Sequence, residues 1–182
     1  MLDEEKARRI MRELQAPQDV IDHCEAVNRV CLETVEKLRR KNPALKINKR
    51  LVSIAALLHD IGRMKTQGID HAVTGAQILR DLNTDNDPDM ENVAQICEKH
   101  IGGGITRSEA AKLGLPDKDY VPKTIEEKIV AYCDNLIDEE DGKIIVREPS
   151  WVAMKYEKKH GKNSEPALMV KELNAFFEGL LS

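Results

Sequence analysis

The chain has 182 residues, of which 41% are hydrophobic, 33% are charged and only 3% are aromatic, a composition that fits one globular domain with a helix-rich surface. Its formal net charge of −4 argues against nucleic acid or an anionic membrane surface as a partner. No apolar run approaches the roughly 20 residues of a membrane-spanning helix, and residues 1–6 lack the apolar core of a signal peptide, so we expect a cytoplasmic protein without a membrane partner.

Apolar residues recur at helical spacing along most of the chain and predict an all-α fold of about seven to nine helices. We expect residues 1–182 to form a single domain, with a core at about 18–138, an N-terminal helix at 3–15 and a C-terminal helical extension at 149–182. The predicted helices cover about residues 3–15, 18–41, 48–60, 70–82, 88–100, 106–113, 124–137, 151–160 and 164–181. Residues 143–146 are strand-like, but we expect them to be too short to make a sheet, with 138–142 as a solvated stop before them.

The third predicted helix ends in a way that is unfavourable for a purely structural helix. Its apolar run leads directly into His59 and Asp60, and Gly62 follows as the expected helix stop. An Asp near a helix C-terminus opposes the helix dipole, at about 0.3–1 kcal/mol if exposed, and burying it unpaired costs more. A divalent metal held against His59 and Asp60 would remove these penalties, so we expect one there.

Further candidate ligands lie on or beside apolar helix faces or at helix ends. Together with the first pair they make a set of six: His23, His59, Asp60, His71, His100 and Asp134. Burying so many ionisable groups is costly unless they are paired or bind a metal. Imidazole and carboxylate ligands together suit Mn, Fe, Co, Ni or Zn and do not suit Ca. The fifth histidine, His160, lies in a basic stretch and is expected at the surface.

In chain order, these residues resemble the H…HD…D signature of the HD-domain superfamily: His23, then His59-Asp60, then Asp134. Residues 59–62 also resemble the HDIG variant of this signature, and Arg63 occupies its usual basic position. The stretches 21–27, 71–79 and 131–136 are similar to the family's helices around the first His, its HxxxGAxIL segment and its last Asp. The resemblance covers about residues 18–138 and is greatest to small stand-alone HDIG proteins of the archaeal type.

The resemblance implies a compact helical bundle and a metal-dependent phosphohydrolase, either a phosphatase or a phosphodiesterase. It places the first metal on four side chains: His23, His59, Asp60 and Asp134. His71 and His100 match the additional ligands of members with two metals, in which Asp60 would bridge the ions. The implied cofactor is one or two ions of Mn, Fe, Co, Ni or Zn, with Mg as a further option. Residues 100–104 read HIGGG in place of the GYP element of cyclic-dinucleotide phosphodiesterases, so we do not expect such a substrate.

The expected reaction is hydrolysis of a phosphomonoester or phosphodiester, in a nucleotide or a similar small phosphorylated substrate. Because divalent metals activate water and neutralise phosphoryl charge, Asp60 and Arg63 are the candidate catalytic residues. Arg63, Lys65 and Arg107 are candidate phosphate contacts. The glycines 102–104 could bring backbone amides close to a phosphate, although a helix stop and flexible loop is the favoured interpretation.

Three alternatives stay open. The six-ligand set also permits an oxygenase with a di-iron pair, as in some HD-fold proteins. A non-catalytic regulator that binds metal and nucleotide is a second alternative. DNA binding is not expected, because residues 106–116 resemble a helix-turn-helix only superficially and the net charge argues against it. The apolar C-terminal helix, with Phe176 and Phe177, is expected to pack over the core, and a homodimer contact is the alternative.

Overall fold

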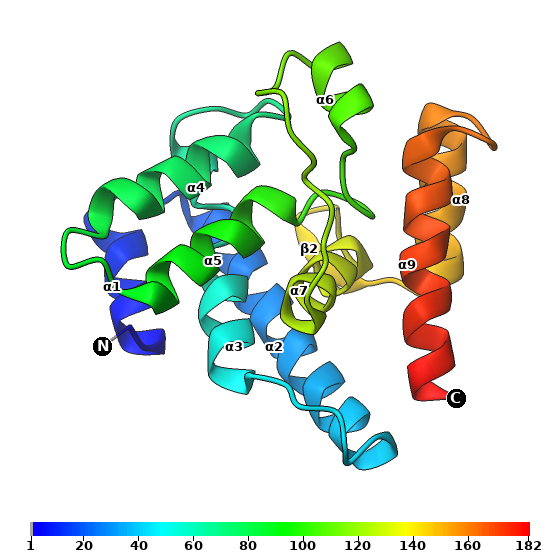
Figure 1. Cartoon of the computed structure of the whole chain (residues 1–182), viewed down its shortest axis with the longest axis horizontal. Helices are drawn as coiled ribbons and strands as arrows, with labels where there is room; N and C mark the ends of the chain where they lie inside the picture. Colours follow the sequence, from blue (N-terminus) through cyan, green and yellow to red (C-terminus); the bar gives the residue numbers. More distant parts are fainter. Residues whose placement is uncertain (1) are drawn as a thin grey trace.

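The computed structural model describes residues 2–182, and in this range it contains nine α-helices, one short 3₁₀-helix and a two-stranded sheet (Figure 1). The elements are α1 (Glu4–Glu13), α2 (Gln18–Lys41), α3 (Lys49–Leu58), η1 (Ile61–Met64), α4 (His71–Leu82), α5 (Pro88–Lys99), α6 (Arg107–Lys112), α7 (Ile125–Leu136), β1 (Ile137–Glu140), β2 (Lys143–Val146), α8 (Pro149–His160) and α9 (Glu165–Leu181). The predicted all-α class and number of helices are confirmed. No helix in the described range is long and apolar enough to cross a membrane.

Helix starts follow from local capping chemistry. The side chain of Asn48 accepts a hydrogen bond from the backbone N–H of Leu51 and begins α3. At the start of α7, the Thr124 hydroxyl accepts from the backbone N–H of Glu127, and the Glu127 carboxylate accepts from the backbone N–H of Thr124. These caps fix where the helices that carry the candidate ligands begin.

The expectation that residues 143–146 cannot make a sheet is wrong. They form β2, which pairs antiparallel with β1 from Ile137↔Val146 to Glu140↔Lys143. The loop between the strands is Asp141-Gly142, and both residues have positive φ, 52° and 71°. Such a two-residue loop matches the twist of paired strands, and Asp-Gly is among its strongest sequence signals. The acidic stretch 138–142 is therefore a strand and its turn, and not a simple helix stop.

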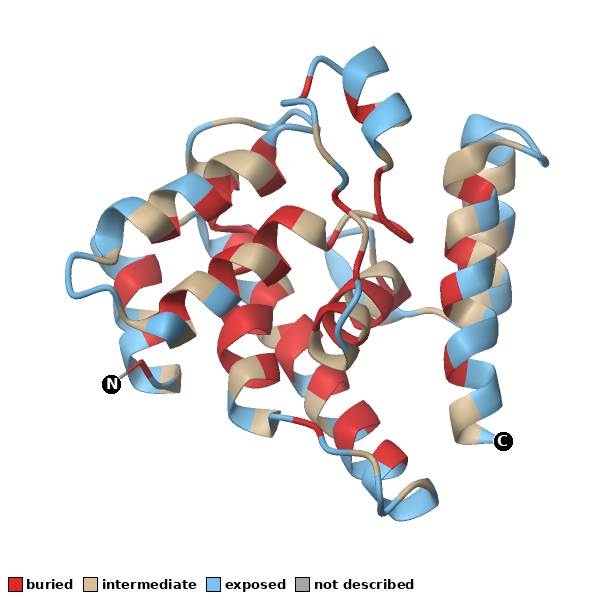
Figure 2. Ribbon diagram, viewed as in Figure 1, coloured by how far each residue is buried: buried red, intermediate tan, exposed pale blue. Residues whose placement is uncertain are grey.

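Helix α3 lies at the centre of the core. All seven residues from Val52 to Leu58 are buried, and Figure 2 shows the buried positions of α2, α3, α5 and α7 facing one another. A helix that is apolar on all sides is enclosed by other elements. Because α3 is enclosed, the residues that follow it, His59 and Asp60, enter the interior and not the solvent.

A buried ion pair joins α5 to α7. Lys99 Nζ lies 2.6 Å from Glu127 Oε1, with side chains only 15% and 4% exposed. Burial alone would raise the pKa of Glu127, but the Lys99 ammonium and the backbone N–H groups of Lys123 and Thr124 outweigh it and hold this pKa below its ordinary value of 4.5. The pair fixes the end of α5, and with it the next residue, His100.

The last two helices pack side by side at one edge of the bundle (Figure 1). Phe177 of α9 is fully buried and stacks on Tyr132 of α7, with ring centroids 4.2 Å apart. Helix α9 therefore covers the core, as expected. Phe176 and Leu168 of the same helix remain 39% and 44% exposed, and the homodimer stays a prediction.

Candidate metal centre

Four imidazoles and two carboxylates converge where five helices meet. Each comes from a different part of the chain, except the adjacent pair after α3: His23 from α2, His59 and Asp60 between α3 and η1, His71 as the first residue of α4, His100 directly after α5, and Asp134 from α7. Their donor atoms form three overlapping triads, each with all atoms within 4.8 Å of one another. The structure thus brings together all six residues that the sequence suggested as ligands.

One half of the cluster is built around Asp134. Its Oδ1 lies 2.9 Å from His23 Nε2 and 3.4 Å from His59 Nε2. The two Nε2 atoms are 3.3 Å apart. Two ring nitrogens and one carboxylate oxygen therefore point at a common position.

The other half contains His71 and His100, whose Nε2 atoms are 3.2 Å apart. Asp60 Oδ1 faces both, at 3.1 Å and 3.5 Å. The second oxygen, Asp60 Oδ2, lies 3.7 Å from His23 Nε2 and 3.8 Å from His59 Nε2. Asp60 stands between the two halves, with one oxygen turned to each.

The tautomers of three histidines can be assigned from their second ring nitrogen. In each, Nδ1–H donates to the backbone carbonyl oxygen three residues earlier: His59 to Ala56 (2.8 Å), His71 to Gly68 (2.8 Å) and His100 to Cys97 (2.6 Å). In the neutral ring, Nε2 then carries a lone pair and no proton. Backbone partners of this kind also orient histidines that bind metals.

This assignment leaves the second half short of protons. His71 and His100 direct two lone pairs at each other, and Asp60 Oδ1 is buried without a partner in hydrogen-bond geometry, although His71 Nε2 is 3.1 Å away. A buried acceptor without a partner costs about 1–3 kcal/mol. A divalent cation would accept all three lone pairs, so the residues present fit a metal ion.

The charge states also suit a metal. Burial alone would raise the pKa of Asp134, but the hydrogen bonds and charges of His23 and His59 outweigh burial and hold this pKa well below its usual range. Burial would likewise raise the pKa of Asp60, yet the charge of His59 and the contacts of His100 and His71 hold it well below normal. Burial lowers the pKa of His100 and favours the neutral imidazole. Carboxylate and neutral imidazole are the ligand forms of Asp60, Asp134 and His100. Burial alone would lower the pKa of His59, but nearby Cys24, Asp60 and Asp134 outweigh it and raise this pKa, so a metal ion would have to displace a proton from His59.

Gly62 has a different role from the helix stop that we expected. Its φ is not in the left-handed region, so it does not serve as an αL cap. A Cβ at Gly62 would lie 1.9 Å from the carbonyl oxygen of His71 and 2.6 Å from the backbone N of Gly75. The missing side chain allows η1 to lie directly against the first turn of α4, and this contact places His71 beside Asp60.

A pocket of about 450 Å³ opens onto the cluster, and His23, Asp60 and Asp134 lie in its wall. Arg63 lines it as well, and its Nε donates to Asp60 Oδ2 at 2.6 Å. The two other predicted phosphate contacts do not line this pocket. Lys65 is an exposed side chain of the following loop.

Arg107 lies at the start of α6 and pairs with Asp117, with an Nε–Oδ1 distance of 3.3 Å. Both side chains are largely exposed, at 64% and 79%. The structure therefore gives Arg107 a surface ion pair and does not bring it to the cluster.

Sequence reasoning missed four further residues in the lining of this pocket. They are Asn135 from α7 and three side chains from α8: Lys155, Tyr156 and Lys159. Lys155 is held by Asp138 at 2.7 Å, whereas Lys159 has no carboxylate within 4.0 Å among residues 2–182. The i,i+4 spacing of Lys155 and Lys159 placed them on one helix face, but nothing in the sequence indicated where α8 docks.

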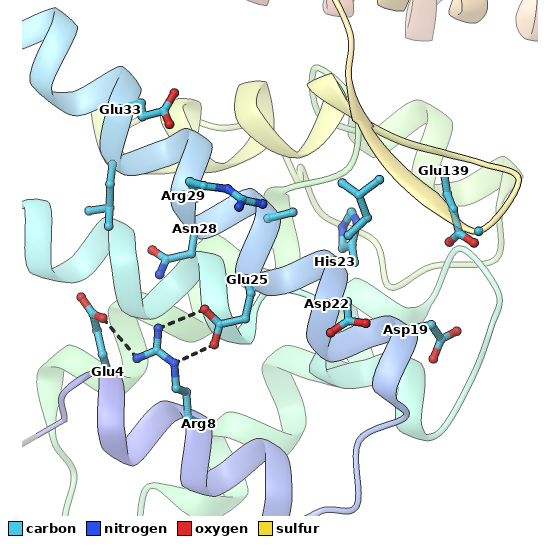
Figure 3. Close-up of a pocket in the computed structure, with 14 residues that line it drawn as sticks. Glu4, Arg8, Asp19, Asp22, His23, Glu25, Asn28, Arg29, Glu33 and Glu139 are labelled. Atoms are coloured by element: carbon cyan, nitrogen blue, oxygen red, sulfur yellow. Dashed lines mark hydrogen bonds and ion pairs between the residues drawn. The ribbon is translucent and has the colours of Figure 1, made fainter.

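Carboxylates gather around His23, and two of them, Asp19 and Glu139, also line the pocket of the metal centre. A wider, open groove of about 850 Å³ begins there, and Figure 3 shows Asp19, Asp22 and Glu139 around His23. In the same groove the Arg8 guanidinium is neutralised by Glu25, with contacts of 2.6 Å and 3.0 Å (Figure 3). The approach on the α8 side therefore carries cations, Arg63, Lys155 and Lys159, together with Asp19 and Glu139, whereas the wider groove is mainly acidic.

Comparison with known proteins agrees with this architecture. The sequence profile of the HD domain matches residues 20–137. The chain belongs to the HD-domain family. This HD-domain protein is 45% identical over 177 residues to an uncharacterised protein of Methanocaldococcus jannaschii, and the match covers 97% of the chain and 98% of the relative.

Two longer relatives and one solved structure are also similar. The tRNA (cytidine(56)-2'-O)-methyltransferase of Picrophilus torridus is 46% identical to this chain over 135 residues, and that of Thermoplasma volcanium is 45% identical over 134 residues. Each match covers 74% of this chain but only 36% of the relative. The crystal structure of the HD domain of the L. monocytogenes phosphodiesterase PgpH aligns over 97% of this chain and 98% of that one, with a TM-score of 0.47 and 17% identity.

Proposed function

We propose that this HD-domain protein is a metal-dependent phosphohydrolase that cleaves a small phosphomonoester or phosphodiester, with a nucleotide as the candidate substrate. The observation that carries the proposal is the position of Asp60 between two pairs of imidazoles, with one oxygen facing each pair. A carboxylate placed in this way offers one oxygen to each of two neighbouring divalent ions.

In this proposal the first ion is held by Asp60 and three further side chains: His23, His59 and Asp134. The second is held by Asp60 with His71 and His100. Mn, Fe, Co, Ni and Zn suit these ligands, and Mg is a further option. When bound, such ions lower the pKa of water and neutralise the charge that develops on phosphoryl oxygens.

Two cations beside the cluster support the binding of a substrate anion. Arg63 and Lys159 line the pocket on the α8 side together with Asp19 and Glu139, whereas the wider groove beyond His23 holds additional carboxylates. Asp60 holds Arg63 through Nε, and the terminal nitrogens of the guanidinium make no hydrogen bond within residues 2–182. These nitrogens are therefore available to a phosphate oxygen, which a guanidinium binds in a forked geometry. We assign Arg63 to the transferred phosphoryl group and Lys159 to the remaining negative charge of the substrate.

Phosphate release from a panel of nucleotides and sugar phosphates tests the proposal. The chain is stripped with a chelator, reloaded separately with Mn²⁺, Co²⁺, Ni²⁺ or Mg²⁺, and compared with its Asp60→Asn variant. We expect hydrolysis to require the metal and to fall at least 100-fold in Asp60→Asn, because one change removes a ligand from both ions. The exposed loop carboxylate Asp85 gives the matched control Asp85→Asn, with activity unchanged. Hydrolysis that is indifferent to chelation or to Asp60→Asn would overturn the proposal.

Two other functions make different predictions in the same experiments. The carboxylate between two imidazole pairs also fits a di-iron oxygenase, which would be isolated with iron and would consume oxygen, and full turnover under anaerobic conditions excludes it. A regulator would bind a nucleotide tightly without hydrolysing it. Because two relatives are named as tRNA methyltransferases, the panel also includes short phosphorylated RNA oligonucleotides.

A further inference from the structure

The side chain of Cys97 in α5 lies between two chain segments that carry candidate ligands. It is fully buried, and its Sγ lies 2.9 Å from the carbonyl oxygen of His59 and 3.5 Å from that of Ala72. His59 directly precedes Asp60, and Ala72 follows His71 in the first turn of α4. One sulfur atom therefore contacts the backbone beside both members of the Asp60–His71 pair.

The backbone of Cys97 contacts the third segment. Its carbonyl oxygen accepts the hydrogen bond from His100 Nδ1–H at 2.6 Å, and a bond of this kind orients the ring of a histidine that binds metal. Through its sulfur or its carbonyl group, Cys97 touches every segment that carries a candidate ligand of the second ion: Asp60, His71 and His100. The sulfur itself belongs to none of the three ligand triads.

The chemistry of the sulfur assigns it the donor role in these contacts. A cysteine thiol is protonated at neutral pH and is a weak hydrogen-bond donor, whereas a carbonyl oxygen can only accept. The single S–H proton goes to the nearer oxygen, that of His59, and the oxygen of Ala72 packs against the same sulfur. The thiol thereby ties the chain between α3 and η1 to α5.

Gly75, one turn after His71 in α4, makes room for the sulfur. A Cβ at this position would lie 2.7 Å from Cys97 Sγ, so any larger residue would push α4 and α5 apart. The close approach of these helices places His71 beside His100, with their Nε2 atoms 3.2 Å apart. The spacing of the second pair of imidazoles therefore depends on the contact between Gly75 and Cys97.

We propose that the Cys97 thiol is a positioning group of the metal centre. Its S–H holds the chain at His59 and Asp60 against α5, so that Asp60 Oδ1 meets His71 and His100. This inference rests on the proposed metal centre and phosphohydrolase function. It adds a residue that lies outside the HD signature and acts only through the ligands that it holds.

The test measures Mn²⁺ binding to the metal-free full-length chain by isothermal titration calorimetry. Cys97→Ala removes the donor, and Cys97→Ser removes nearly the same volume but keeps a hydroxyl donor. We expect Cys97→Ala to weaken the second ion about 10- to 100-fold, the usual cost of losing a group that holds metal ligands, and Cys97→Ser to recover most of this loss. The first ion should change little, because the ring of His59 is held by the carbonyl oxygen of Ala56 in its own helix.

Cys31→Ala is the matched control. Cys31 is also fully buried, and its Sγ contacts the carbonyl oxygen of Ile129 at 4.0 Å, which is neither a candidate ligand nor next to one. The control loses the same volume from the core and should bind both ions like the unchanged chain. If circular dichroism shows that Cys97→Ala does not fold, Gly75→Ala is added to it, because the new Cβ takes the space of the sulfur without restoring a donor.

Metal binding separates this inference from the function. If Cys97→Ala binds both ions as the unchanged chain does, or if Cys97→Ala and Cys97→Ser weaken the second ion equally, the inference is overturned and the phosphohydrolase is left intact. A second ion that is weakened in Cys97→Ala and recovered in Cys97→Ser, in a chain that hydrolyses no ester, would support the positioning role and refute the phosphohydrolase.

Discussion

Replacing Gly62 with alanine should damage the second half of the metal centre from a position that touches no substrate. The new Cβ would lie 1.9 Å from the carbonyl oxygen of His71 and 2.6 Å from the backbone N of Gly75. Both are backbone atoms of one helical turn, so the contact is relieved only if η1 and α4 separate by about 1 Å. His71 moves with that turn and leaves Asp60 Oδ1, which it now approaches to 3.1 Å.

The magnitude follows from the size of this shift. Overpacking of this kind costs about 1–3 kcal/mol in the free energy of unfolding, and a displacement of about 1 Å at a reacting centre costs on the order of 100-fold in rate. We expect Gly62→Ala to unfold at lower urea concentration, to bind one metal ion fewer per chain, and to lose about 100-fold in kcat/KM for phosphate release.

Gly179 in α9 provides the matched control. A Cβ there meets no atom within 4 Å, so Gly179→Ala should leave metal binding and activity unchanged and stabilise the chain by about 0.5–1 kcal/mol through helix propensity. The measurements are urea unfolding followed by circular dichroism, metal content and phosphate release. A Gly62→Ala chain that matches the unchanged chain in all three would refute the argument that the missing side chain positions α4.

Three further predictions concern other parts of the molecule. Lys159→Ala should raise KM about 10-fold with little change in kcat, because it removes one charge-assisted contact to the substrate. Lys158→Ala, at the neighbouring exposed position, is the control and should change neither constant. The ion-paired Glu127 has a lowered pKa, so its contribution to stability is complete above the unfolded-state pKa of about 4.5 and is lost as the pH falls through the lower folded-state value. The difference in free energy of unfolding between the unchanged chain and Glu127→Gln should therefore shrink below pH 4.5. A constant difference from about pH 7 to about pH 3 would contradict this. Phe177→Ala should cost about 3–5 kcal/mol in urea unfolding, because the ring is fully buried, and Phe176→Ala, which is 39% exposed, about 1 kcal/mol or less.

The sequence predicted most of the fold because its helices carry their own signals. Apolar stripes, the Asn48 cap and the Thr124 capping box are local features, and the helices lie close to the predicted ranges. The β1–β2 hairpin was missed although its turn, Asp141-Gly142, is a local signal as well. Its first strand carries no apolar alternation, because only Ile137 of β1 is buried.

The six candidate ligands could be named from the sequence because histidines and aspartates beside apolar stripes stand out chemically. The structure brings them together, and their role as ligands stays a prediction. The position of Asp60 between the two pairs of histidines depends on how η1 packs on α4, and so does the need for a glycine at position 62. Only the three-dimensional contacts reveal this packing. Lys155, Tyr156 and Lys159 were missed because α8 docks beside the centre through tertiary contacts that local sequence does not encode.

The number of metal ions per chain tests the shared carboxylate most directly. Metal-free chain is saturated with Mn²⁺, passed over a desalting column and analysed by mass spectrometry for bound metal, in parallel with Asp60→Asn and the control Asp85→Asn. We predict two ions per chain in the unchanged protein and in Asp85→Asn, and fewer than one in Asp60→Asn, because the lost carboxylate serves both halves. An unchanged chain that retains no metal, or an Asp60→Asn chain that retains two ions, would contradict the proposed centre.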